Sequence, residues 1–203
     1  DLGSAEIETL GRNSLRETGA TALEIPLMWE WPAERCLGLI RESEGEELLA
    51  EYQAGSQGLL LLAPHLGNWE LAGLFFASRY SMAALYSPPN QPGFEAYMKA
   101  VRSRSGSELV ATDRRGIMRL FSILREGGVV GILPDQTPRR EGGEFAPFFG
   151  IPAITMTLAS KLVQKTGARP LVTYAQRLPD AQGFRIVIRE AEPGMDSKDM
   201  TES

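Results

Sequence analysis

The chain has 203 residues, 43% of them hydrophobic, with 21 lysines and arginines against 26 aspartates and glutamates and a formal net charge of −5. This length and composition fit one globular domain that can bury a sizeable core. A single cysteine, Cys36, excludes an internal disulfide framework and a cysteine cluster for zinc, and no stretch approaches the roughly 18 consecutive apolar residues of a membrane span.

The net charge hides an asymmetry along the chain. Residues 1–51 hold twelve acids and four bases, a net −8, whereas residues 99–140 hold nine bases and four acids, a net +5. A basic block inside an acidic protein favours a local anionic partner over general nucleic-acid affinity, so no nucleic acid is expected as a partner. The alternative is that these bases only form solvated helix faces. The bases are Lys99, Arg102, Arg104, Arg114, Arg115, Arg119, Arg125, Arg139 and Arg140.

The N-terminal part, residues 1–57, is predicted to be helical. Residues 5–20 show weak helical periodicity, and a second helix is expected over Ala33–Arg41, directly after Pro32. Ser43 and Glu46 have the spacing of a capping box, which predicts a third helix running to Glu51.

The pattern then alternates between short apolar runs and helical stretches, which indicates βαβ units and a largely parallel sheet. We therefore expect an α/β fold, one domain over residues 1–203 with a mostly parallel sheet flanked by helices, and an α/β catalytic core at 58–191. A last pair of strands should pair with each other. The expected strands are 59–62, 82–86, 108–111, 129–133, 170–177 and 184–189, and the expected helices are 69–79, 93–104, 114–126 and 155–166.

The segment Pro134–Pro152 is predicted to be a long loop. It is rich in proline and contains three phenylalanines, and Pro138 and Pro147 disfavour a strand hairpin. A long loop with aromatic side chains is usually functional, the alternative being that its rings plug the core.

His65, the only histidine, lies at a turn between a predicted strand and a predicted helix. Asn68 is a preferred N-cap residue, which puts Glu70 in the first helical turn, where the helix dipole favours a carboxylate. A helix that begins between them lets Glu70 meet His65, fix its tautomer and stabilise its protonated form, as in a histidine–carboxylate pair. The alternative is a structural histidine beside an ordinary first-turn carboxylate. One histidine gives zinc too few of its usual ligands, so no metal is expected. No cofactor is expected either.

Three blocks in this order resemble the lipid A biosynthesis acyltransferases, the lauroyl- and myristoyl-transferring enzymes within the wider glycerolipid acyltransferase superfamily. The resemblance covers roughly residues 20–190. It implies an α/β fold and transfer of an acyl chain from acyl carrier protein or coenzyme A to a hydroxyl of a lipid A precursor. The blocks are Pro64-His65-Leu66-Gly67-Asn68-Trp69-Glu70, Leu133-Pro134-Asp135-Gln136 and Pro147-Phe148-Phe149-Gly150-Ile151-Pro152-Ala153.

By this resemblance, His65 matches the family's general base and Glu70 its motif glutamate. Arg102 matches an arginine near the site, and Asp135 the aspartate of the second block, which Gln136 follows. Asn68, Arg102, Asp135 and Gln136 are therefore expected to bind substrate, with Arg102 or a backbone N–H near Asn68 stabilising the oxyanion. The mechanism needs no covalent acyl-enzyme.

The resemblance also implies a membrane surface as partner and a place at the cytoplasmic face of the bacterial inner membrane. For the mechanism, we expect a tunnel for the acyl chain, lined by Leu71, Leu74, Phe75 and the phenylalanines of 145–149. The family's N-terminal membrane anchor is missing from this chain and its C-terminal stretch is cut short, so truncation at both ends is expected. The alternatives are a related acyltransferase acting on a phosphatidylinositol mannoside, a glycerophosphate or an ornithine lipid, or a non-catalytic module that binds lipid or carrier.

Overall fold

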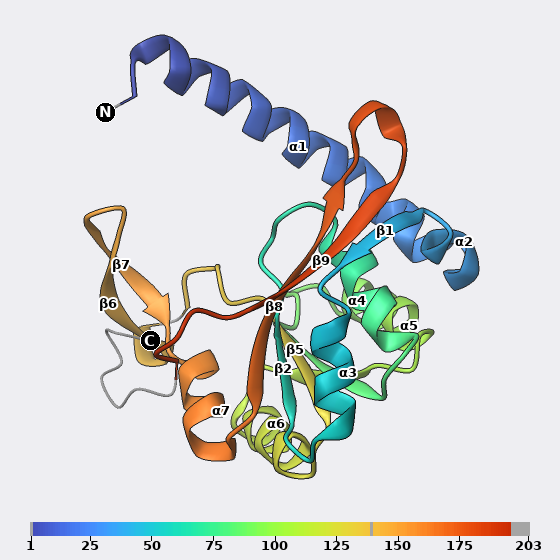
Figure 1. Cartoon of the computed structure of the whole chain (residues 1–203), viewed down its shortest axis with the longest axis vertical. Helices are drawn as coiled ribbons and strands as arrows, with labels where there is room; N and C mark the ends of the chain where they lie inside the picture. Colours follow the sequence, from blue (N-terminus) through green and yellow to red (C-terminus); the bar gives the residue numbers. More distant parts are fainter. Residues whose placement is uncertain (1, 139, 196–203) are drawn as a thin grey trace.

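The computed structural model describes residues 2–138 and 140–195 (Figure 1). Its strands are β1 (Ile40–Glu44), β2 (Leu59–Leu62), β3 (Met82–Tyr86), β4 (Glu108–Ala111), β5 (Val129–Ile132), β6 (Gly143–Phe148), β7 (Ile151–Met156), β8 (Arg169–Arg177) and β9 (Phe184–Glu190). Its helices are α1 (Ser4–Glu30), α2 (Ala33–Leu37), α3 (Glu47–Ala54), α4 (Trp69–Ala77), α5 (Pro92–Ser103), α6 (Arg114–Arg125) and α7 (Leu158–Thr166).

Seven strands form one sheet in the order β1-β9-β8-β2-β5-β3-β4. The pairs β2–β5, β5–β3, β3–β4 and β8–β2 are parallel, whereas β8 and β9 pair antiparallel. The predicted α/β fold with a mostly parallel sheet is therefore confirmed, and so is the predicted pairing of the last two strands.

The two faces of the sheet bury separate cores, because side chains alternate along each strand. On one face Leu59 and Leu61 pack with buried residues of α1, α2, α3 and α4. On the other face Leu60 and Leu62 pack with buried residues of α6 and α7. Both faces of β2 and β5 are covered, which explains why these strands read as unbroken apolar runs.

The N-terminal part is helical as predicted, except for one strand, and the helix bounds differ from those expected. The helix expected at 5–20 extends to Glu30, and the one expected over Ala33–Arg41 ends at Leu37. Residues 40–44 instead form β1, which pairs in parallel with β9 at the edge of the sheet. The prediction that Ser43 opens a helix with a capping box is wrong, because Ser43 lies in β1 and α3 begins only at Glu47. Pairing with a distant strand overrides a local capping pattern here.

The predicted loop at Pro134–Pro152 is wrong in its second half, where β6 and β7 form an antiparallel hairpin. Pro147 and Pro152 lie opposite each other in it. Both strands of a two-stranded ribbon are edges, and an edge strand tolerates proline. The hairpin also takes up the start of the helix predicted at 155–166, so α7 begins only at Leu158.

The first part of α1 extends away from the body of the molecule (Figure 1), and its residues up to 19 are exposed. Within residues 2–138 and 140–195, no helix is both long and apolar enough to cross a membrane.

Candidate active site

His65 lies at the carboxyl edge of the central strands, in the turn from β2 to α4. The turn is held against β8, because the Asn68 N–H donates to the Ala175 carbonyl at 3.0 Å and Gly67 bridges to the same residue. Gly67 has φ +62°, and a Cβ there would lie 2.0 Å from the Ala175 oxygen. Only glycine fits this left-handed, closely packed position.

Asp135 holds His65 at two points. Its Oδ1 lies 2.8 Å from the imidazole Nδ1, and its Oδ2 accepts the backbone N–H of His65 at 2.7 Å. A carboxylate only accepts hydrogen bonds, so in the neutral ring this contact favours the tautomer with the proton on Nδ1 and the lone pair on Nε2. The Gln136 amide nitrogen lies 3.1 Å from that Nε2. Asp135 thus makes the contact that was expected of Glu70.

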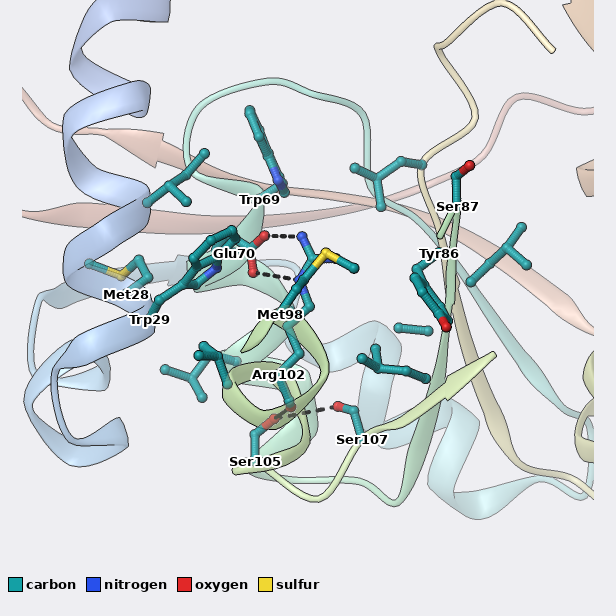
Figure 2. A pocket seen from close by; sticks show the side chains of 18 of the residues that line it. Met28, Trp29, Trp69, Glu70, Tyr86, Ser87, Met98, Arg102, Ser105 and Ser107 are labelled. Atoms are coloured by element: carbon teal, nitrogen blue, oxygen red, sulfur yellow. Dashed lines mark hydrogen bonds and ion pairs between the residues drawn. The ribbon is translucent and has the colours of Figure 1, made fainter. Parts of the chain in front are cut away.

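Glu70 faces a different partner. It accepts hydrogen bonds from the guanidinium of Arg102, at 3.2 Å from Nε and more closely from a terminal nitrogen (Figure 2). The expected pairing of Glu70 with His65 is therefore replaced by a Glu70–Arg102 ion pair between α4 and α5. The helix does begin where predicted, with Asn68 as N-cap and Glu70 in the first turn. Asp135 follows the strand next to β2, so it meets His65 at the same edge of the sheet.

Asn68 is buried completely and does not present its side chain to a substrate. Its Oδ1 accepts the Leu71 N–H at 3.0 Å and its amide donates to Glu24 Oε2 at 3.1 Å. Its own N–H is used by Ala175, so it is not an oxyanion donor either. The expected binding role of Asn68 is corrected to one of shaping the turn.

A polar network joins this turn to α1. Arg177 on β8 donates to both carboxylate oxygens of Glu24, at 2.6 and 2.7 Å, and also contacts Glu17 and Thr21. The Thr21 hydroxyl donates to the Gly67 carbonyl at 3.1 Å. The hydrogen bond with Glu24 raises the pKa of Arg177 above its usual value, so its charge persists at all ordinary pH values.

A cavity of about 1120 Å³ opens beside this turn. His65, Glu70, Arg102 and Gln136 lie on its wall, and much of the rest is apolar. Figure 2 shows Glu70 and Arg102 among apolar side chains of this lining. Its lining comes chiefly from α1, α4, β3 and α5, including Met28, Trp29, Leu74, Tyr86, Phe94 and Met98. A long hydrocarbon chain and a reactive polar end both fit such a lining.

Of the residues expected to line a tunnel, only Leu74 does so. Leu71 and Phe75 are buried in the core, and the phenylalanines of 145–149 lie on or next to β6, outside the cavity lining. The contribution of α1 to the lining was not predicted, although the nearby pair Trp29 and Trp31 gave a signal for it. Glu24 and Arg177 were not predicted either, because they are 153 residues apart and carry no local signal.

The basic residues of 99–140 do not form one continuous surface of unpaired positive charge. Arg102 pairs with Glu70, Lys99 with Glu95 and Arg119 with Glu108, while Arg104 donates to the Trp29 carbonyl. Internal ion pairs therefore account for several of these bases. Arg139 lies outside the described residues. Among the side chains that the structure describes, no three of His, Cys, Asp and Glu are grouped to hold a metal ion.

The chain is similar in sequence to several known acyltransferases. The chain is 27% identical over 184 residues to the lipid A biosynthesis palmitoleoyltransferase of Escherichia coli K12, covering 90% of this chain and 59% of that protein. It is 24% identical over 204 aligned positions to the lipid A biosynthesis lauroyltransferase of the same organism, covering 99% and 66%. It is also 28% identical over 138 residues to a phosphatidylinositol mannoside acyltransferase of Mycobacterium tuberculosis CDC 1551, covering 66% and 43%.

The chain thus spans about three fifths of the length of the first of these relatives. Residues 3–203, nearly the whole chain, match the family described as bacterial lipid A biosynthesis acyltransferase. The chain belongs to the bacterial lipid A biosynthesis acyltransferase family.

Proposed function

We propose that this protein transfers a fatty acyl chain from a thioester, carried by acyl carrier protein or coenzyme A, to a hydroxyl of a lipid A precursor. The observation that carries the proposal is the position of His65. Asp135 contacts its Nδ1, and His65 lines a largely apolar cavity that is large enough for an acyl chain. Family membership supports the reaction class.

His65 acts as the general base in this proposal. Its Nε2 takes the proton of the acceptor hydroxyl as that oxygen attacks the thioester carbonyl, and Asp135 balances the imidazolium that forms. The acceptor hydroxyl takes the place at Nε2 that the Gln136 amide holds in this structure. The tetrahedral intermediate then breaks its C–S bond, and His65 returns the proton to the leaving thiolate. The acyl group never bonds to the enzyme.

Glu70 and Arg102 serve the charged end of the substrate. Glu70 holds the Arg102 guanidinium at the wall of the cavity that His65 also lines, where a positive charge stabilises an oxyanion or an acceptor phosphate. The positive end of α4, which begins at Trp69, adds to that field. Glu70 thus acts through Arg102 rather than through His65.

A lipid acceptor resides in a membrane and the thioester donors in the cytoplasm. We therefore propose that the protein works at the cytoplasmic face of the bacterial inner membrane, bound peripherally or anchored through a segment outside this chain.

The test is acyl transfer by the purified protein, with labelled acyl carrier protein or acyl-CoA as donor and a lipid A precursor as acceptor. Transfer that falls by about 10²–10⁴ in His65→Ala supports the mechanism. Equal rates in the two proteins would refute it. A phosphatidylinositol mannoside acceptor is run in parallel, because a relative of this chain carries that name. Transfer to it alone would reassign the acceptor and keep the chemistry.

A further inference from the structure

The β6–β7 hairpin carries four large apolar side chains that are exposed to solvent, Phe145, Phe148, Phe149 and Ile151. At its tip Phe148 is 64%, Phe149 92% and Ile151 70% exposed. Figure 1 shows the hairpin standing away from the main sheet, with its tip in solvent. The family chemistry proposed above does not use this tip, because none of these three residues lines the cavity.

The turn at the tip is built against local preference. Phe149 has φ +49° and Gly150 φ +79°, as in the two-residue hairpin turns that favour Asn-Gly or Asp-Gly. A bulky aromatic residue in the left-handed region is strained. Phe149 therefore places an almost fully exposed ring at a position where asparagine or aspartate would give a less strained turn.

Charge is confined to the base of the hairpin. From Phe145 to Met156 the sequence contains no charged side chain, whereas Glu144 and Arg140 lie exposed just before it. An apolar projection with its charges withdrawn to the base suits the boundary between the headgroups and the acyl chains of a lipid layer.

Two prolines reduce the number of free backbone donors on the hairpin. Pro147 and Pro152 lie opposite each other and have no N–H. Each unsatisfied N–H is costly in lipid, so these prolines favour immersion. They also disfavour pairing of a hairpin edge with the edge of a second copy, which would need those donors.

The base of the hairpin reaches the cavity. Gly142, directly before β6, and Met156, the last residue of β7, both line it, as does Pro138 upstream. A lipid that enters the cavity along the hairpin therefore stays beside apolar surface.

We propose that the β6–β7 hairpin inserts its Phe148–Ile151 tip into the acyl boundary of a phospholipid membrane and holds the cavity mouth at that surface. Insertion is independent of catalysis. Its use in delivering the acceptor rests on the proposed function.

A depth measurement tests insertion directly. Cys36 is fully buried, so a cysteine placed at the tip by Phe149→Cys is labelled selectively with an environment-sensitive fluorophore. The matched control is Gln57→Cys, exposed before β2 at the opposite edge of the sheet. On vesicles of phosphatidylethanolamine and phosphatidylglycerol, the label at 149 should shift to shorter wavelength and be quenched by lipids that carry a quencher on the acyl chain. The label at 57 should do neither.

A second variant separates insertion from folding. Phe149→Asn suits the turn better and should raise the thermal unfolding midpoint, yet it should weaken vesicle binding by about tenfold through loss of the ring. Met118→Asn removes an exposed apolar side chain from α6 and should leave vesicle binding unchanged.

No response of the 149 label to vesicles, or equal vesicle binding by wild type and Phe149→Asn, would overturn the proposal. A label shift that depends on protein concentration without vesicles would also overturn it, in favour of self-association. Acyl transfer by the wild-type protein is scored separately. Insertion without transfer would refute the proposed function alone, and transfer without insertion would refute the hairpin proposal alone.

Discussion

The Asn68 amide donates a hydrogen bond to Glu24 Oε2, which ties the helix cap beside His65 to the long helix α1. Glu24 is held in turn by Arg177, so three distant segments meet behind the catalytic turn. The geometry of His65 therefore depends on groups that never face the cavity.

Asn68→Ala should lower the free energy of unfolding by about 1–3 kcal/mol, because it removes the cap acceptor of α4 and the donor to Glu24. Asn68→Asp keeps the cap acceptor but sets a second carboxylate against Glu24, so its loss of stability relative to wild type should shrink as the pH falls and the introduced aspartate is protonated. Urea unfolding at several pH values measures both. Asn90→Ala, in an exposed loop, is the control. A fully stable Asn68→Asp protein at neutral pH would contradict this interpretation.

His65 is the only histidine of the chain, so its tautomer can be measured without overlap from other histidine signals. In a ¹⁵N-histidine spectrum, the neutral ring should be protonated at Nδ1, because Asp135 accepts there. Asp135→Asn should shift the population toward the Nε2 tautomer and reduce acyl transfer by about 10²–10⁴. Asp180→Asn, an exposed change, should alter neither property. A wild-type ring protonated at Nε2 would rule out Nε2 as the base.

Glu70 and Arg102 should behave as one unit, separate from His65. Glu70→Gln and Arg102→Lys should each reduce acyl transfer, and the double mutant should lose less than the sum, with a coupling of about 0.5–3 kcal/mol. Glu70→Gln should leave the His65 tautomer unchanged, which distinguishes it from Asp135→Asn. The exposed Glu108–Arg119 pair is the comparison cycle, with an expected coupling below about 1 kcal/mol. A changed tautomer in Glu70→Gln would restore Glu70 as the partner of His65.

Gly73 is a position at which the cavity can be filled. It lines the cavity within α4, and a Cβ there would meet no atom within 4 Å. Gly73→Ala should therefore stabilise the protein by about 0.5–1 kcal/mol, and Gly73→Leu should shift donor preference toward shorter acyl chains. Competition between donors of different length measures the shift. Gly11→Leu, at an open site on α1, should leave chain preference unchanged. Unaltered preference in Gly73→Leu would place the acyl chain elsewhere.

Local signals predicted the central part of the fold well. The run Leu59–Leu62 and the cap at Asn68 specify their strand and helix with residues adjacent in sequence, and the structure begins α4 at Trp69. β1 and the β6–β7 hairpin were missed because their stability depends on partners that sequence periodicity does not reveal.

The same distinction holds at the site. The spacing of His65 and Glu70 allows a contact, but it does not say which carboxylate makes it. That choice depends on the strand order, which puts β5 next to β2 and brings Asp135 to His65. Asp135 could be placed near the histidine from the sequence, as a residue following a parallel strand, yet its hydrogen bond to the ring could not.

Leu62 and Ile132 are register partners in β2 and β5, and His65 and Asp135 each follow their strand by three positions. The spacing of base and carboxylate is thus set by the hydrogen-bonded ladder. The cavity, by contrast, takes much of its lining from the helices α1, α4 and α5, which are not part of that ladder. Selection can therefore reshape those helices for a new acyl chain or acceptor while the proton-transfer pair stays intact, which would let one scaffold serve several lipid substrates.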